Sequence, residues 1–298
     1  MIALELDCNG RALVLDRPRI CGIVNVTADS FSDGGRFLDP QRAIEHAIAL
    51  VEEGADLIDI GGESTRPGAA EITLADEIAR AVPVIEALAK RISVPISIDT
   101  SKPEVMRAAV AAGAGLINDV HALRRDGALD AAAELGVPVC LMHMQGEPRT
   151  MQDAPEYDDV VAEVHRFLAE RLFAVQMAGI DKKKILIDPG FGFGKTLEHN
   201  LALLRSLDRF PELAPVVVGL SRKATIGTLT GRENPADRAV GSAAAALIAV
   251  QRGAMIVRVH DVAVTRDALA VWQAVAKGDA PAKRAAAPAK TNSLWDDD

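Results

Sequence analysis

Residues 96–119, ISIDTSKPEVMRAAVAAGAGLIND, contain two short apolar runs that flank a helix-like segment. The first run ends on Asp99 and the second on Asn118, while Pro103 and Gly113 are typical of a helix start and a helix end. The stretch therefore predicts a strand, a helix and a second strand parallel to the first. The polar side chains would then lie together, at the carboxyl ends of the two strands.

The same unit repeats along the chain. Eight apolar runs end on polar or glycine residues, and they read ICGIVN to Asn25, LIDIGG to Gly61 and Gly62, ISID to Asp99, LIND to Asn118 and Asp119, VCLMH to His143, ILID to Asp188, VVVGLS to Ser221 and MIVRVH to His260. Helix signals follow these runs near 40–53, 74–91, 103–112, 127–135, 156–178, 197–207, 236–252 and 262–276. Eight strand–helix pairs predict an α/β fold, a (β/α)8 TIM barrel, with its functional groups in one mouth.

The two ends of the chain differ from the repeating part. Asn9-Gly10 separates two alternating runs and predicts a β-hairpin, which we expect to cover the bottom of the barrel. Residues 278–298 are rich in Ala, Pro and charge and have no periodic apolar face, so they predict a disordered tail. The expected barrel domain thus covers 1–277.

Composition excludes several functions. The chain of 298 residues has a net charge of -9 and no Lys/Arg-rich stripe, which argues against nucleic-acid binding. No window approaches the roughly 20 apolar residues of a membrane span. The N-terminus has acidic residues at Glu5 and Asp7 and no long apolar segment, so we expect no membrane partner and a cytoplasmic location. The three cysteines lack zinc-site spacing, and we expect them to be reduced and without a chemical role.

Several loops carry chemistry-bearing residues. Residues 59–68, DIGGESTRPG, could bind phosphate through backbone N–H groups and a guanidinium, although a solvated loop is the ordinary alternative. Residues 188–196, DPGFGFGKT, lack the glycines of a P-loop or a dinucleotide fingerprint. Lys223 after the seventh strand, and Arg258 and His260 in the eighth, would add cations where such barrels often bind phosphate.

These motifs, in this order, closely resemble the dihydropteroate synthase family of pterin-binding barrels. The resemblance spans roughly 1–277 and rests on IVNVTADSFSDGG, GADLIDIGGESTRPG, ISIDT, LINDV, LMHMQG, IDPGFGFGK, GLSRK and VRVHD. It implies condensation of 6-hydroxymethyl-7,8-dihydropterin diphosphate with 4-aminobenzoate, giving 7,8-dihydropteroate and diphosphate. It also implies Mg2+ as cofactor, bound at Asn25, small molecules as partners, and a homodimer.

The resemblance assigns roles to individual residues. Catalytic roles fall on Asn25, Thr65, Arg66, Lys223, Arg258 and His260. Substrate contacts fall on Thr65, Ile117, Met142, Phe193, Ser221, Lys223, Arg258, His260 and the pterin-reading Asp99, Asn118 and Asp188. The acidic and amide groups suit the N–H donors of a pterin edge, while Ile117, Met142 and Phe193 are expected as apolar walls. We expect His143 to make a structural hydrogen bond.

Two positions depart from the family pattern. Ala28 stands where proline is expected in the first loop, and Ala224 follows Lys223 where many relatives have serine. The second change puts a hydroxyl contact to the aminobenzoate carboxylate in doubt. Two alternatives stay open: a non-catalytic pterin-binding paralogue, and a methyltetrahydrofolate:corrinoid methyltransferase, which does not need diphosphate-binding loops.

Overall fold

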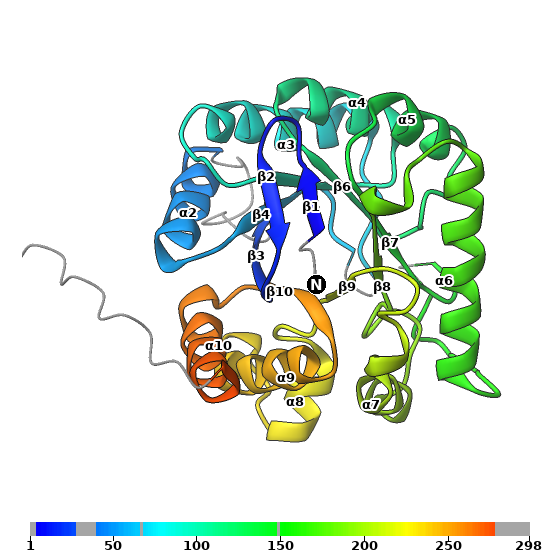
Figure 1. The fold of residues 1–298 in the computed structure, drawn as a ribbon. Helices are drawn as coiled ribbons and strands as arrows, with labels where there is room; N and C mark the ends of the chain where they lie inside the picture. Colours follow the sequence, from blue (N-terminus) through cyan, green and yellow to red (C-terminus); the bar gives the residue numbers. More distant parts are fainter. Residues whose placement is uncertain (1–3, 28–39, 66–67, 148–149, 278–298) are drawn as a thin grey trace, which may run out of the picture.

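Eight parallel strands close into a barrel in the computed structural model, which describes residues 4–27, 40–65, 68–147 and 150–277 (Figure 1). Around the barrel the order is β10-β3-β4-β5-β6-β7-β8-β9, so each strand pairs with its neighbour in sequence and the last closes on the first. The strands are β3 (Arg19–Asn25), β4 (Leu57–Gly61), β5 (Ile96–Asp99), β6 (Leu116–Asp119), β7 (Val139–Met142), β8 (Ile185–Asp188), β9 (Val216–Val218) and β10 (Ala254–Val259). The predicted (β/α)8 barrel is confirmed.

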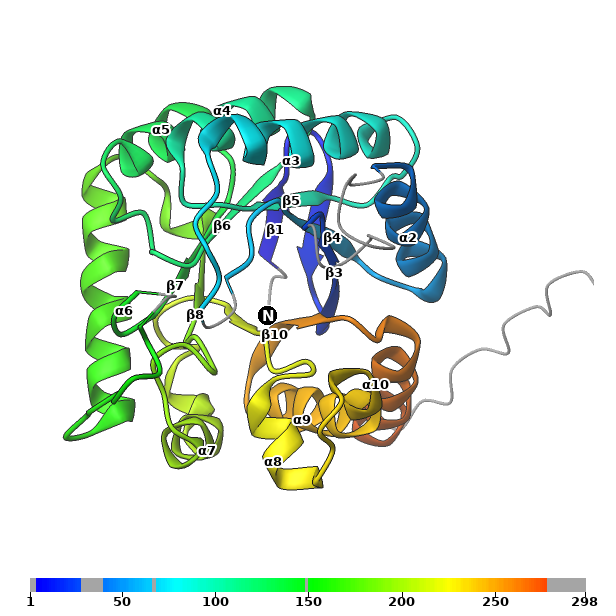
Figure 2. The same cartoon turned by 180° about the vertical axis from the view of Figure 1, so that it is seen from behind.

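Helices surround the strands on the outside (Figures 1 and 2). They are α2 (Pro40–Glu53), α3 (Leu74–Ala89), α4 (Pro103–Ala112), α5 (Ala128–Leu135), α6 (Val160–Met177), α7 (Leu197–Arg205), α8 (Ala224–Thr230), α9 (Ala239–Gln251) and α10 (Val262–Lys277), with 3-10 turns η1 (Lys182–Lys184), η2 (Leu207–Arg209) and η3 (Pro235–Arg238). In the described residues, no helix is both long enough and apolar enough to cross a membrane.

Most helices match their predicted ranges, and the differences have local causes. Helix α6 begins at Val160 rather than 156, because the Asp159 side chain caps its first turn by accepting hydrogen bonds from two backbone N–H groups. The short helix α8 was not predicted. It follows the Lys223 turn and ends at Gly231, which has a positive φ of 67°.

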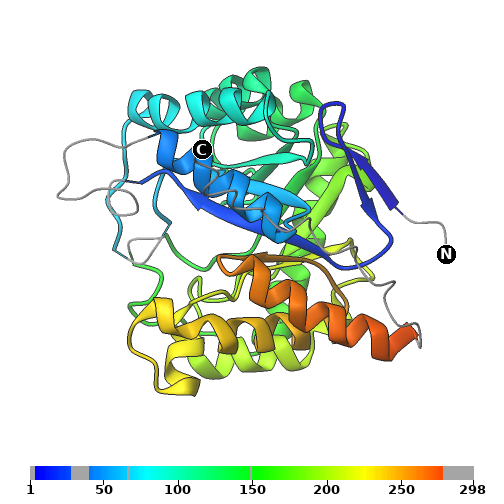
Figure 3. The ribbon, with the colours of Figure 1, turned by 90° about the vertical axis from the view of Figure 1, so that its left-hand side faces the viewer.

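The N-terminal hairpin covers one end of the barrel (Figure 3). Its strands β1 (Leu4–Asp7) and β2 (Ala12–Leu15) are joined through Asn9 and Gly10, whose positive φ values of 57° and 82° suit a type I′ turn. Leu6, Cys8, Leu13 and Leu15 pack against interior side chains from the amino-terminal parts of the strands. The expected cover over the bottom of the barrel is therefore confirmed.

Side chains along each strand alternate between the barrel interior and the helices. Ile58 and Ile60 of β4 belong to the large apolar cluster that also holds helix residues, whereas Leu57 belongs to the interior cluster under the hairpin. Asp59 and Gly61 share the interior side of β4 with Leu57, because they are two and four residues further along the strand. This alternation decides which polar groups face the mouth.

Some sequence expectations lie outside the described residues. These are the first loop with Ala28 and its glycines, Arg66 in the second loop, and the tail over 278–298. Their predicted roles stay predictions.

Candidate active site at the carboxyl ends of the barrel strands

One guanidinium joins two buried carboxylates inside the barrel. Arg258 Nε donates to Asp59 Oδ2 at 2.5 Å, and Arg258 Nη2 donates to Asp99 Oδ2 at 2.8 Å. Asn118 Nδ2 donates to the same Asp59 oxygen at 3.2 Å. Strands β4, β5, β6 and β10 thus bring four polar side chains together, although 199 residues separate Asp59 from Arg258.

The electrostatics of this cluster follow from burial. Burial raises the pKa of Asp99 to about 7, although the Arg258 charge opposes this shift. The pKa of Arg258 lies above its ordinary value, since the favourable charges of Asp59 and Asp99 outweigh burial. Among the described residues, Oδ1 of Asp59 and Oδ1 of Asp99 accept no hydrogen bond although both atoms are buried. These two oxygens therefore have unused capacity to accept hydrogen bonds.

A second group gathers around the end of β8. Asp188 Oδ1 accepts a hydrogen bond from Gly190 N at 2.7 Å, and burial raises the pKa of this carboxyl group. Lys223 Nζ donates to the carbonyl oxygen of Phe191 and lies 4.5 Å from the ring centroid of Phe193. Burial lowers the pKa of Lys223 to about 8, against the favourable charge of Asp188. The lysine therefore lies on an aromatic face and interacts electrostatically with the Asp188 carboxylate.

Apolar side chains close one side of the mouth. Met142 and Phe193, both expected as walls, form a buried cluster with Val120, Met144 and Met151. Ile117, the third expected wall, is fully buried in the large cluster between strands and helices. That expectation is corrected, because Asn118 points into the barrel and its strand neighbour must point outward. Val120, which the sequence did not point to, lies with Met142 and Phe193 in the buried cluster.

The remaining expected residues lie at the rim. Ser221 Oγ is 3.0 Å from His260 Nδ1, and a bidentate ion pair between Arg222 and Asp261 holds the two turns that carry them. Asn25 ends β3 beside Gly61, where an added Cβ would lie 3.6 Å from Asn25 Oδ1. Within the described ranges, no three His, Cys, Asp or Glu side chains are grouped to hold a metal ion.

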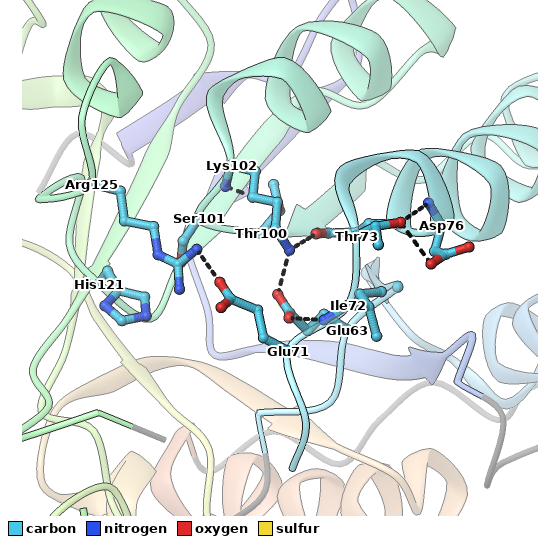
Figure 4. Close-up of polar contacts among 12 residues, drawn as sticks. Glu63, Glu71, Ile72, Thr73, Asp76, Thr100, Ser101, Lys102, His121 and Arg125 are labelled. Atoms are coloured by element: carbon cyan, nitrogen blue, oxygen red, sulfur yellow. Dashed lines mark hydrogen bonds and ion pairs between the residues drawn. The ribbon is translucent and has the colours of Figure 1, made fainter. Parts of the chain in front are cut away.

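A cavity of about 200 Å³ lies at the mouth of the barrel, beside the loop that follows β4. Thr65 and Glu63 of that loop line it, together with Asp99 from β5 and Val120 and His121 after β6. Thr65, expected in a loop, and Asp99, expected at the end of a strand, thus share one cavity. Figure 4 shows some of its lining residues, among them Arg125 and Glu71. These two side chains form an ion pair with an N–O distance of 3.0 Å.

A buried lysine holds the loop after β8. Lys195 Nζ donates to His143 Nδ1 at 2.9 Å, to Gly190 O at 2.9 Å and to Phe193 O at 3.0 Å. Its three N–H groups are thereby satisfied in a site where the side chain is 3% exposed. The structural hydrogen bond expected for His143 is confirmed, and Lys195 fixes the loop that presents Asp188 and Phe193.

Comparisons with known proteins agree with this geometry. A family model described as pterin binding enzyme matches residues 21–260. The dihydropteroate synthase of Escherichia coli K12 is 52% identical over 272 residues, which cover 91% of this chain and 96% of the relative. This chain belongs to the dihydropteroate synthase family. The family's enzyme from Haemophilus influenzae is 50% identical over 92% of this chain and 99% of its own length.

Solved structures of dihydropteroate synthases have the same fold. The Xanthomonas albilineans synthase with 4-aminobenzoic acid is 63% identical, has a TM-score of 0.88 and matches 92% of this chain and 98% of its own. The same enzyme in complex with 7,8-dihydropteroate is 60% identical, with a TM-score of 0.84 and coverage of 91% and 98%. A Yersinia pestis synthase in a sulfonamide drug complex is 49% identical, has a TM-score of 0.88 and matches 92% and 99%.

Sequence reasoning missed part of this dihydropteroate synthase mouth. Asp59 was quoted within a loop motif but given no role, although its place two residues before Gly61 on the interior side was a usable signal. Lys195 was considered only as part of a possible nucleotide-binding motif over 188–196, and no structural role was predicted for it. Lys102 gave no sequence signal, because its partners Glu63 and Glu77 come from other elements.

Proposed function

We propose that this chain joins 6-hydroxymethyl-7,8-dihydropterin diphosphate to 4-aminobenzoate, releasing 7,8-dihydropteroate and diphosphate. The observation that carries the proposal is the set of buried acceptors around Arg258, in a chain 63% identical to a synthase solved with 4-aminobenzoic acid. A pterin has an amino-pyrimidinone edge with several N–H donors, which the buried carboxylate oxygens complement.

In the proposed complex the pterin edge binds the deep polar groups. Asp99, Asn118 and Asp188 accept or exchange hydrogen bonds with the ring, and Lys223 donates to its carbonyl or ring nitrogen. Arg258 lays its guanidinium plane along the ring face, held in that orientation by Asp59 and Asp99. Met142, Phe193 and Val120 form the apolar walls. The contacts of Arg258 with both carboxylates support this arrangement, because they restrict its rotation.

Bond cleavage separates charge at the rim of the proposed site. The methylene C–O bond breaks and its electron pair leaves with the diphosphate, while the electron-rich dihydropterin stabilises the positive carbon. The amine of 4-aminobenzoate then attacks that carbon, forming the C–N bond, and loses a proton to solvent. We propose that Thr65, Arg66, Ser221 and His260 bind the diphosphate. Isotope effects at the methylene carbon test this order, since a tight associative signature contradicts ionisation before attack.

Mg2+ would be held mainly by the substrate in this proposal. Asn25 offers one amide oxygen at the end of β3, and Mg2+ in such sites is commonly bound by few protein groups plus substrate phosphates. The bound ion would neutralise charge on the departing diphosphate. Asn25 therefore fits as a single ligand, and Mg2+ affinity should depend on the presence of the diphosphate. Calorimetric titration of Mg2+ with and without diphosphate tests this.

One assay tests the reaction itself. The protein is supplied with the pterin diphosphate, 4-aminobenzoate and Mg2+, and both dihydropteroate and diphosphate are measured. We expect the two products in equal amounts, and a folded protein that forms neither contradicts the proposal. Assays lacking either substrate are the controls. A homodimer is proposed on the family resemblance, and sedimentation velocity tests it.

A further inference from the structure

A partly buried lysine outside the reacting centre connects three elements beside the loop that follows β4. Lys102 directly precedes α4, and its Nζ donates to Glu77 Oε2 of α3 at 2.7 Å and to Glu63 Oε2 at 2.9 Å. Figure 4 shows Lys102 and Glu63 beside the segment that carries Ile72. The Lys102 side chain is 13% exposed and that of Glu77 is fully buried. No role in the proposed chemistry falls on any of the three.

Glu63 joins the two ends of the segment that carries Thr65. We call its described residues, 62–65 and 68–73, the β4–α3 segment. Glu63 lies near its start, and Glu63 Oε1 accepts a hydrogen bond from the backbone N–H of Ile72 near its end, at 3.0 Å. The same carboxylate therefore contacts Lys102 with one oxygen and closes the segment with the other. Thr65 lies two residues from Glu63 and lines the cavity with Asp99.

Helix α3 fixes the base of the same segment. A Cβ at Gly62 would lie 3.1 Å from Glu77 Cγ and 3.2 Å from Glu77 O, so the segment leaves the barrel in close contact with this helix. Arg80 Nη1 donates to Gly62 O at 3.3 Å, and the Thr73 side chain caps α3 by accepting from Asp76 N at 3.1 Å. The backbone is thus held at both ends, and Lys102 supplies the ionic contact between the segment and the helix.

The ordinary reading is that Lys102 only neutralises a buried glutamate. Two carboxylates share this one ammonium, and Glu77 Oε1 has no hydrogen-bond partner among the described residues. Neutralising Glu77 does not require a contact to Glu63, whereas holding the β4–α3 segment does. The contact between Lys102 and the less buried Glu63 therefore indicates that Lys102 also positions the segment.

We propose that Lys102 is a positioning residue that, through Glu63, holds the β4–α3 segment where Thr65 meets the substrates. The inference rests on the proposed synthase reaction and adds a residue that touches no reacting atom. Misplacing a substrate-binding group by about 1 Å can lower a rate by about a hundredfold, so the effect should be measurable. It should fall on 4-aminobenzoate and diphosphate, because the pterin contacts come from the deeper Asp99, Asn118 and Asp188.

The decisive variant removes both charges of the buried pair. Lys102→Met alone leaves Glu77 buried and unpaired, which lowers stability and could prevent folding. Lys102→Met with Glu77→Met replaces the pair by apolar side chains of similar length, so stability should return toward that of the unchanged protein. Glu63 nevertheless stays without its ammonium. The double variant therefore separates the structural role from the positioning role.

We expect the double variant to have normal pterin affinity by calorimetry and kcat/KM for 4-aminobenzoate at least about tenfold lower. The Ile72 amide, which donates to Glu63, should exchange its hydrogen faster. Full recovery of kcat/KM together with stability would overturn the proposal, as would an equal loss of pterin affinity. Lys90→Met is the matched control, because Lys90 pairs with Glu86 near the end of α3 with side chains 72% and 60% exposed.

The exchange measurement also separates this proposal from the proposed reaction. If the unchanged protein forms no dihydropteroate, the synthase reaction is wrong, yet the Ile72 amide still reports whether Lys102 holds the segment. If the protein is active and Ile72 exchange is unchanged in the double variant, the positioning role is wrong and the reaction stands.

Discussion

At its amino-terminal end the barrel is filled by Cys21, Leu57, Leu116, Cys140 and Leu186 under the hairpin, whereas its carboxyl end holds charged and amide groups. The same strands supply both ends. Leu57 and Asp59 are two residues apart on β4, and Leu116 and Asn118 are two apart on β6. A step of two residues keeps a side chain in the interior and moves it from the floor to the mouth.

This difference between the two ends of the barrel separates the residues that stabilise the fold from those that bind substrates. Burying the floor side chains stabilises the fold by about 25 cal/mol per Å² of apolar surface. This contribution does not depend on the orientation of the neighbouring groups. The mouth buries carboxylates, which is costly unless they are paired, so Arg258 and Lys223 lie among them. Changes in the mouth should therefore alter binding, and changes in the floor should alter stability.

The largest effect should come from Asp188→Asn in the mouth. Asparagine keeps an oxygen for the Gly190 N–H, now at 2.7 Å, but it removes the charge and turns one acceptor into a donor facing the pterin. We expect pterin diphosphate to bind at least about a hundredfold more weakly, with little change in urea-induced unfolding. Calorimetry measures this, and Asp267→Asn, at an exposed position of α10, is the control. Unchanged affinity would remove Asp188 from the proposed site.

Gly115→Ala, at the floor, should lower stability without changing activity, the opposite of the effect expected for Asp188→Asn. A Cβ at this position would lie 2.1 Å from the carbonyl oxygen of Cys8, so the hairpin must shift away from the floor. We expect a loss of about 1–3 kcal/mol in the free energy of unfolding, measured in urea. The kcat/KM of the folded fraction should stay the same. A variant that folds normally but loses activity would contradict the separation of floor and mouth.

The mouth alone should also respond to pH. Burial raises the pKa of Asp99 to about 7, so below that pH Asp99 carries a proton and loses acceptor strength toward pterin N–H groups. Burial lowers the pKa of Lys223 to about 8, so above that pH its positive charge is lost. We expect kcat/KM to rise toward pH 7 and to fall above pH 8.

Two variants test whether Lys223 and Asp99 set the alkaline and acidic limbs of this pH profile. Lys223→Arg keeps its charge at high pH, so in any residual activity the decline above pH 8 should disappear. Asp99→Asn should remove the acidic limb. A profile that is unchanged in both variants would show that other groups set it.

The smallest effect should come from Cys140→Ala in the floor. The side chain is 2% exposed and burial raises its thiol pKa, so it has neither access nor thiolate character. We expect a loss of about 1 kcal/mol in stability and no change in substrate affinity. In the native protein all three cysteines, which are buried, should resist iodoacetamide and react only after unfolding. Rapid alkylation of the native protein would contradict this.

Local patterns in the sequence sufficed for the barrel and for much of its mouth. Each barrel strand was predicted from a short apolar run, and Gly113 follows its helix with a positive φ value as expected. Asp99, Asn118, Asp188, Ser221 and His260 could be selected because polar strand ends in a barrel meet at one mouth. The error at Ile117 arose because assigning a wall needs the side of the strand, and its neighbour Asn118 already faces inward.

The sequence by itself determined the order of strands and helices, the hairpin turn and the mouth to which the polar groups belong, because these follow from periodicity and from turn and cap residues along neighbouring positions. Only the tertiary structure decided that Arg258 bridges Asp59 and Asp99, that Val120 rather than Ile117 joins Met142 and Phe193, and that Lys102 joins Glu63 to Glu77. These contacts depend on the register and closure of the barrel, which bring together side chains that no local pattern relates.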